Sequence, residues 1–312
     1  MVQQEIVFLN ARTCGIYKNG APRYRTDPST GKRTEEIDNE LIEAVGSFVA
    51  GAASAAQSRV SLTEVYRRRV LVPTYYDSRY GDGIAKLLAD LSVEGVTLGE
   101  LLDGHTIKVR GGHGSPGNDQ RTGHIPYVKV SDIRGLRVNV NPTNLVTEGV
   151  ARRFWRGDSS GLEAWDLITP NRASSNIGEF AILLPGEEQI VLTKEVFVFR
   201  LVKDDAWDPF YLLWALSLQA VRDQWRRIAL MQTNREDCGS RHREIIIPKP
   251  PSPAWARQKS AAFREYFTTL AGATDRFVKS VGSDGLAYIA SVVSALPRGD
   301  EGGNSDPGED EA

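Results

Sequence analysis

A run of short β-type segments between residues 96 and 201 constrains the fold most strongly. Here apolar-rich stretches alternate with Gly, Pro and Asn turn signals: HTIKVRGG, IPYVKVSDI, LRVNV, EFAILLPG and QIVLTKEVFVFRL. Short strands separated by frequent turn residues are typical of a β-dominated domain, because each turn ends one strand and reverses the chain. We therefore expect a mostly-β domain in this part of the chain.

Helical patterns flank this region on both sides. Apolar residues recur at three- and four-residue steps over residues 37–49. Residues 208–230 begin with Asp208 as a cap and Pro209 in the first turn, which predicts a helix. Residues 253–281 follow PKPPSP and carry an apolar stripe of Phe263, Phe267, Leu270, Phe277 and Val278. The sequence thus predicts an α+β fold, with flanking helices and a long helix near the C-terminus.

Shifts in composition divide the chain into four expected segments. Residues 1–60 form an N-terminal arm and helix, residues 61–250 the main domain, and residues 251–296 the C-terminal helix. Residues 297–312 form an acidic tail, and from Gly299 onward it holds six acidic side chains and no basic one. Such a polar, like-charged segment is expected to stay disordered.

The net charge of −2 hides a strongly basic region. Residues 105–156 hold nine Lys or Arg against three acidic residues, with aromatic and Asn side chains between them. Arg and Lys attract phosphates, Arg pairs bidentately with guanine and Asn with adenine. A solvated β-domain surface with scattered cations explains the same composition, so both interpretations stay open at this point. A second basic run comprises Arg222, Arg226, Arg227, Arg235, Arg241 and Arg243.

The common enzyme signatures are absent from the sequence. It has no GxxxxGK[ST] loop, no HExxH and no GxSxG, and the Gly-rich RGGHGSPG lacks the strand–GxGxxG–helix context of a dinucleotide site. His105, His113 and His124 match no common metal-site spacing, which favours surface or groove histidines. The N-terminus lacks a signal-peptide pattern, and no apolar stretch reaches the roughly 20 residues that span a bilayer. We expect a cytoplasmic protein that binds rather than catalyses.

The order of several short motifs resembles the target-recognition domain of the specificity (S) subunit of type I restriction–modification systems. VTLGELLDG is followed by Gly114-Ser115-Pro116 and then by Ile125-Pro126-Tyr127 through Ser131-Asp132-Ile133. Later pieces are similar to the family in the same order: DLITPNRASSNIGEFAILL, FYLLWALSLQAVRDQW and EIIIPKPPSP. The resemblance covers about residues 96–285. It implies a β-domain that lies along double-stranded DNA and reads base edges in the major groove.

The N-terminal piece IVFLNARTCGIYKNGAPRYRTDPSTGK is similar to the segment that follows the catalytic domain in N6-adenine DNA methyltransferases. This second resemblance implies that residues 1–60 dock a partner methyltransferase. S-adenosylmethionine would then be bound by that partner, and the chain needs no cofactor of its own. Only one recognition domain and one spacer-like helix are visible, whereas the family usually has two of each. The C-terminal helix is therefore expected to pack against the methyltransferase or a second copy of the chain, although a contact within the chain explains the same stripe.

Chemistry and loop position select the candidate DNA-binding residues. Base reading is assigned to the SerAsp segment and to the TPNRASSN loop, with these residues: Arg121, Lys129, Ser131, Arg134, Arg137, Arg172, Ser174, Ser175 and Asn176. Arg152, Arg153 and Arg156 are assigned to phosphates, which position a protein on DNA without specifying sequence. The competing interpretation of Ser131-Asp132 is a structural turn or cap.

Two rival functions remain at this stage. One is a protein–protein adaptor of a defence operon that reads no bases. The other is a stand-alone nuclease or other enzyme, which the missing catalytic motifs disfavour.

Overall fold

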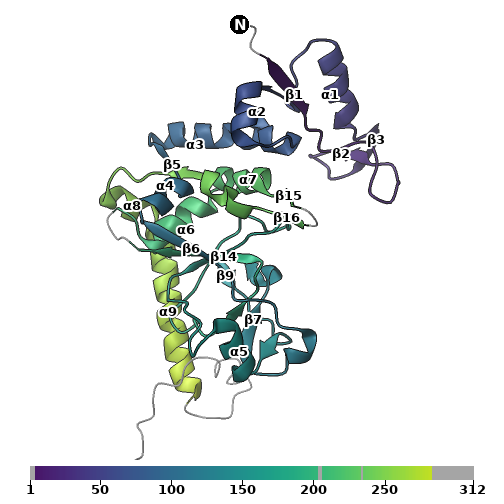
Figure 1. Cartoon of the computed structure of the whole chain (residues 1–312). Helices are drawn as coiled ribbons and strands as arrows, with labels where there is room; N and C mark the ends of the chain where they lie inside the picture. Colours follow the sequence, from purple (N-terminus) through teal and green to yellow (C-terminus); the bar gives the residue numbers. More distant parts are fainter. Residues whose placement is uncertain (1–3, 203–205, 233–234, 283–312) are drawn as a thin grey trace, which may run out of the picture. The chain divides into compact units, whose positions relative to one another are not determined.

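The computed structural model describes residues 4–202, 206–232 and 235–282, and its fold class is α+β as predicted. The chain forms two compact units (Figure 1). Unit 1 comprises residues 1–99 and 218–249, and unit 2 comprises residues 100–217 and 250–312. Unit 1 thus takes in residues 61–99 and 218–249, which the sequence analysis assigned to the main domain.

Unit 1 begins with a strand pair and a hairpin. β1 (Glu5–Leu9) runs antiparallel to β4 (Gln57–Ser61), and β2 (Tyr24–Thr26) pairs with β3 (Arg33–Ile37). The helices that follow in sequence are α1 (Glu40–Val49), α2 (Leu62–Arg68) and α3 (Asp82–Leu91). Side chains cap two of them, because Asn39 accepts from the N–H of Ile42 and Ser61 accepts from the N–H of Glu64.

The two sequence segments of unit 1, residues 1–99 and 218–249, are joined by a strand pair and a buried side-chain amide. α7 (Gln219–Ile228) leads into the β15–β16 hairpin (Leu230–Gln232, Arg235–Asp237), and β17 (Ile246–Pro248) pairs with β5 (Gly95–Thr97). Gln224 on α7 donates to the carbonyl of Ile246 at 2.8 Å and accepts from its N–H at 3.0 Å. This amide therefore fixes α7 to the β5–β17 pair. Short 3₁₀ turns cover Pro73–Tyr76, Ser78–Tyr80 and Gly239–Glu244.

The described part of unit 2 contains a four-stranded sheet, a three-stranded sheet, a two-stranded pair and a helix that packs on the three-stranded sheet. The antiparallel sheet has the order β12-β11-β14-β6, with bounds Ala181–Ile182, Leu167–Pro170, Val196–Leu201 and Ile107–Gly111. The other has the order β10-β7-β13, with bounds Leu145–Val146, Ile125–Val128 and Val191–Leu192. β8 (Ile133–Arg134) and β9 (Arg137–Val138) form a short antiparallel hairpin. α4 (Leu98–Asp103) precedes β6, and α5 (Glu148–Trp155) follows β10.

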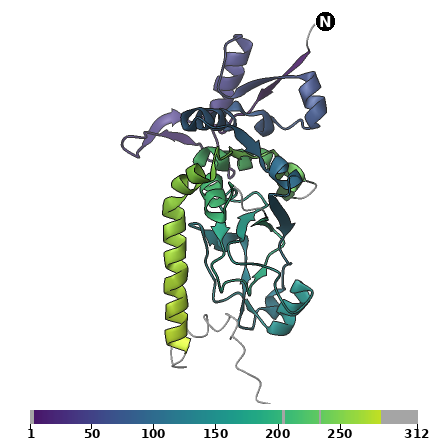
Figure 2. The same ribbon diagram turned by 90° about the vertical axis from the view of Figure 1, so that its left-hand side faces the viewer.

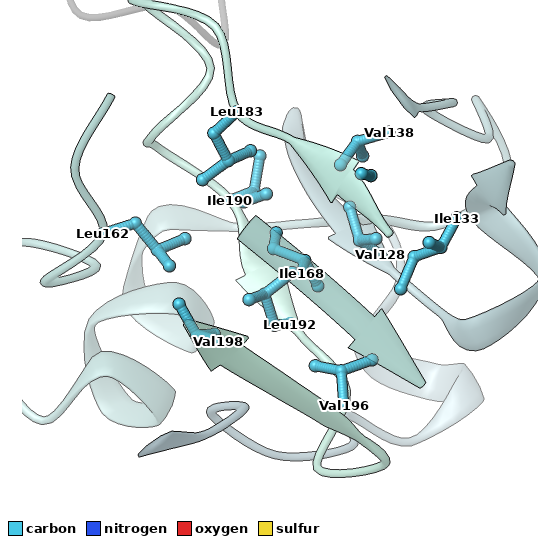
Figure 3. Close-up of a cluster of buried hydrophobic side chains, with 11 residues drawn as sticks. Val128, Ile133, Val138, Leu162, Ile168, Leu183, Ile190, Leu192, Val196 and Val198 are labelled. Atoms are coloured by element: carbon cyan, nitrogen blue, oxygen red, sulfur yellow. The ribbon is translucent and has the colours of Figure 1, made fainter. Parts of the chain in front are cut away.

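The main core of unit 2 lies where both sheets contribute side chains. Figure 3 shows Ile168 of β11, Val198 of β14, Val128 of β7 and Leu192 of β13 within one cluster. On the other face of the three-stranded sheet, Ile125, Tyr127 and Val191 pack with residues of α5. Because successive strand residues point to opposite faces, β7 and β13 are buried on both sides. Burial of each such aliphatic side chain contributes about 1.5–3 kcal/mol, so this core holds the loops at the strand ends in place.

The helix expected over residues 208–230 is two helices. α6 (Pro209–Ser217) is capped by Asp208, whose carboxylate accepts from the N–H groups of Phe210 and Tyr211, as predicted. Leu218 has extended dihedral angles and ends the helical run, and α7 then belongs to unit 1. The prediction of one helix was wrong because α6 is buried nearly all round whereas α7 buries one side, and the apolar pattern runs across the break.

The C-terminal helical region also has a break. α8 (Pro253–Lys259) ends at Ser260, whose hydroxyl donates to the carbonyl of Ala256, and α9 (Ala261–Gly282) continues from there. Within unit 2, α9 extends along the side of the β-strands (Figures 1 and 2). Arg264 of α9 forms an ion pair with Asp208 at 2.7 Å and stacks over Phe210, which fixes the start of α9 to α6. The remainder of the expected helix, residues 283–296, and the acidic tail lie outside the described residues.

The Gly-rich stretch RGGHGSPG is a close-packed connection between β6 and the core. A Cβ atom on Gly112 would lie 1.9 Å from the carbonyl oxygen of Thr193, so only glycine fits there. His113 is half-buried: its Nε2 lies 2.7 Å from the carbonyl of Ser160, and its Nδ1 accepts from the N–H of Leu192 at 2.9 Å. Burial lowers the pKa of His113 to about 4. Both ring nitrogens of His113 are therefore engaged with backbone groups of the chain.

Candidate nucleic-acid interface

The turn that follows β7 is built around a buried carboxylate. Asp132 accepts from the backbone N–H of Lys129 at 2.8 Å and from the hydroxyl of Ser131 at 3.0 Å, and its residue is only 6% exposed. The interpretation of Ser131-Asp132 as a structural turn is thus confirmed for the aspartate. Ile133 points into the main core, and Arg134 and Ser131 are exposed.

A second side chain holds the far end of the same turn. Asn139 donates from Nδ2 to the carbonyl of Arg134 at 3.1 Å, and its own N–H donates to the carbonyl of Asp132 at 2.8 Å. The guanidinium Nε of Arg134 donates to the carbonyl of Ser131 at 3.1 Å. These bonds fix the path of residues 131–134 and aim a cationic side chain outward.

The loop after β11 is joined to this turn by one amide. Asn176 is 1% exposed, and its Nδ2 donates to the carbonyl oxygens of Val130 at 2.6 Å and Ile133 at 3.1 Å. Its Oδ1 accepts from the hydroxyl of Ser174 at 2.8 Å. The structure therefore brings together the two segments that the sequence selected, residues 129–134 and 172–176.

The same burial changes the role assigned to Asn176. Its amide is committed to backbone carbonyls inside the unit, so no surface remains for a base contact. The neighbouring Ser175 is exposed, and Arg172 is half-buried in an ion pair with Glu195 at 2.6 Å. Among the candidates in these two segments, Ser131, Arg134 and Ser175 present the most exposed polar groups.

Arg121, Lys129 and Arg137 lie beside the turn but are partly engaged. Arg121 donates to the carbonyl of Pro116 at 3.0 Å and stacks over Tyr127, over which the ammonium of Lys129 also lies. Arg137 forms an ion pair with Glu187 at 3.5 Å, and burial raises the pKa of that carboxyl. These side chains add positive charge near the turn, but contacts within the protein already fix their positions.

The three arginines assigned to phosphates occupy the last turn and the end of α5. All three are exposed. Arg152 is paired with Glu148 at 2.6 Å, whereas Arg153 and Arg156 form no ion pair within the described part of the chain. Trp155 anchors this turn by donating from Nε1 to the carbonyl of Ile190 at 2.9 Å. Cations at a helix C-terminus also interact favourably with the helix dipole, which is a structural explanation for the same residues.

No group of three His, Cys, Asp or Glu side chains in residues 4–202, 206–232 and 235–282 is placed to hold a metal ion. No helix among the residues that the structure describes is both long and apolar enough to cross a membrane.

Sequence reasoning missed Asn139 as a positioning residue and gave Asn176 the wrong chemistry. The amide partners of Asn176 lie 43 and 46 residues away in the chain, so no local signal identifies them. For Asn139 a signal exists, because Asn directly after a short strand commonly bonds nearby backbone groups.

No protein-family model matches the sequence, and no curated protein matches it. Several solved structures are similar to the chain. The HsdS subunit from Thermoanaerobacter tengcongensis is 14% identical, with a TM-score of 0.37 over 75% of this chain and 51% of that one. The type I restriction–modification S subunit from M. genitalium is 15% identical, with a TM-score of 0.35 over 69% and 49%. The chain spans about half the length of these two proteins.

A third similar chain comes from a structure that describes complex assembly and conformational transition of the type I restriction–modification system. It is 13% identical, with a TM-score of 0.35 over 93% of this chain and 80% of that one.

Proposed function

We propose that the chain is the DNA-recognition subunit of a methyltransferase or restriction–modification complex. It directs a partner N6-adenine DNA methyltransferase to its site and is not itself catalytic. The observation that carries the proposal is the joining of residues 129–134 and 172–176 through Asn176. The two segments assigned to base reading are joined by buried hydrogen bonds, and Arg134, Ser131 and Ser175 are exposed on them.

The chemistry of this surface suits DNA. Arg134 is an exposed guanidinium on a fixed turn, and such a group reads guanine through its O6 and N7 atoms. Two hydroxyls beside it are donors or acceptors for any base edge. Arg153 and Arg156 add phosphate contacts that fix register without reading sequence.

The partner is proposed to bind the N-terminal part of unit 1. On α1 the apolar side chains of Leu41, Ile42, Val45, Phe48 and Val49 are all exposed, and so is that of Ile37 on β3. A contiguous exposed apolar face of this kind marks a protein-interaction surface. The methyltransferase would supply S-adenosylmethionine and the catalytic residues, in the cytoplasm where both proteins meet DNA.

Fluorescence polarisation with a labelled duplex tests the proposal. The chain, alone and with its methyltransferase, is titrated at 50 and 200 mM salt. We expect weak binding alone, tighter binding with the partner, and a steep loss of affinity at higher salt because phosphate neutralisation releases counterions. Absent or salt-independent binding in the presence of the partner would overturn the proposal.

Docking on α1 has its own test. Phe48→Asp with Leu41→Asp should abolish co-purification of the methyltransferase and leave unit 2 intact. The matched control is Leu71→Asp, an exposed apolar side chain of the same unit that lies outside α1. Retained co-purification of the α1 variant would refute docking at this helix. The rival function, an adaptor that reads no bases, is tested separately by the DNA-binding measurement.

A further inference from the structure

Unit 1 holds a cluster of arginines around Tyr75 that the proposed reading surface does not include. Three of them share one carboxylate: Glu244 lies 2.8 Å from Arg241, 3.5 Å from Arg68 and 4.0 Å from Arg227. We call Arg68, Arg227, Arg241 and their carboxylate Glu244 the Tyr75 cluster. Its members come from α2, α7 and the turn Gly239–Glu244, which are far apart in sequence and adjacent within unit 1.

The cluster is held rigidly by the tyrosine. Tyr75 is 3% exposed, and its hydroxyl donates to Glu244. The guanidinium carbons of Arg227 and Arg241 lie 5.1 and 5.2 Å from the centre of its ring. Arg241 also donates to the backbone carbonyl of Arg68. The positions of the guanidinium groups are therefore set before any ligand arrives.

The cluster and the neighbouring ion pairs of Glu64 carry more positive charge than their carboxylates balance. Glu64 pairs with Arg67 and Arg68, so the ion pairs of the described residues oppose four guanidinium groups to two carboxylates. Exposed Arg69 and Arg226 are the sequence neighbours of Arg68 and Arg227. Within the described residues, the Nε atom of Arg227 is buried and has no hydrogen-bond partner. Guanidinium groups held together at this density bind an anion, and planar Arg groups suit the paired oxygens of a phosphate.

We propose that the Tyr75 cluster of unit 1 binds the phosphate backbone of the DNA, as a second contact separate from the reading surface of unit 2. The inference rests on the proposed function, because it takes DNA as the ligand. Its role is to position the duplex and raise affinity for all sequences alike, since phosphate contacts carry no base information.

Fluorescence polarisation of the full chain on a labelled 30-bp duplex tests the cluster. The variant is Arg227→Gln with Arg241→Gln, and the matched control is Arg33→Gln, an exposed arginine of unit 1 that stacks on Tyr24. We expect the double variant to lose about tenfold in affinity and its log–log salt slope to fall by about 2, with the sequence preference unchanged. The control should bind like the unaltered chain.

A second variant keeps the test valid if the first fails to fold. Arg69→Gln with Arg226→Gln changes two exposed side chains at the edge of the cluster, and its salt slope should also fall while its thermal midpoint stays the same. If the unaltered chain binds DNA and the variants show the same affinity and salt slope, the phosphate contact is overturned and the proposed function is not. An unaltered chain that binds no DNA would overturn both the contact and the proposed function. A variant with changed sequence preference would show base reading by the cluster and would contradict the positioning role.

Discussion

The side-chain amide of Asn176 donates a 2.6 Å hydrogen bond to the backbone carbonyl of Val130. This bond crosses from the loop after β11 to the turn after β7, and a second one from the same nitrogen reaches Ile133. One buried side chain thereby couples two surface segments whose exposed residues are proposed to face DNA.

Asn176→Ala is expected to destabilise unit 2 and to weaken DNA binding without any contact to DNA. It leaves the carbonyls of Val130 and Ile133 without their donor, and an unsatisfied buried polar group costs about 1–3 kcal/mol. Chemical denaturation and DNA affinity measure the two effects. Ser175→Ala, at the exposed neighbour, is the control and should leave stability unchanged. Equal stability of the Asn176 variant would show that the coupling is unimportant.

Arg134→Gln should relax sequence preference at one base position, with a loss of about 1–3 kcal/mol between matched and mismatched duplexes. Its guanidinium is exposed and its backbone is held by Asn139, so the fold should not change. Competition binding with single-substitution duplexes measures the preference. Arg257→Gln on α8, an exposed arginine of the same unit, serves as the comparison. An identical preference profile for both variants would exclude Arg134 as a reader.

Arg153→Gln should instead weaken binding to every sequence by the same factor. Arg153 lies exposed at the end of α5 and is assigned to phosphate, so the log–log salt slope should fall by about 1. Titrations on specific and unrelated duplexes at several salt concentrations give both numbers. A loss confined to one sequence would reassign Arg153 to base reading.

His113 should make unit 2 less stable as the pH falls from about 6.5 towards 4. Its folded-state pKa is lowered to about 4 because it is buried, and its Nδ1 accepts from Leu192, so protonation is disfavoured in the folded chain. The unfolded chain takes up a proton near the ordinary pKa of about 6.5, and stability is lost until the folded-state pKa is reached. The full effect is on the order of 3 kcal/mol.

Denaturation between pH 7 and 4 measures this dependence. His113→Asn should be less stable at pH 7 and should lose much of the slope, whereas His124→Gln, at an exposed position, should keep it. The same slope in the His113 variant would place the titrating group elsewhere.

Sequence patterns predicted which parts of the chain are helical or β-stranded and which loops form the candidate interface. Particular residues show what these local patterns cannot predict. The cap at Asp208 and the β-rich middle of the chain follow from local periodicity and turn chemistry. The break at Leu218 does not, because residues on both of its sides favour a helix and the choice is made by which unit buries each half.

Asn176 and His113 illustrate the same limit at the candidate interface. Both carry chemistry that suits a ligand, and both are bound to backbone groups of strands or turns distant in sequence. Residue type and loop position therefore located the surface, whereas tertiary packing decided which side chains remain exposed on it.

Selection of bound duplexes from a random pool tests the central claim most directly. The full chain with its methyltransferase is used for several rounds, and the recovered DNA is sequenced alongside a selection with the Arg134→Gln variant. The account predicts that one motif is enriched by the unaltered complex and that a position of this motif becomes degenerate with the variant. Tight binding with no enriched motif would contradict sequence recognition by this chain.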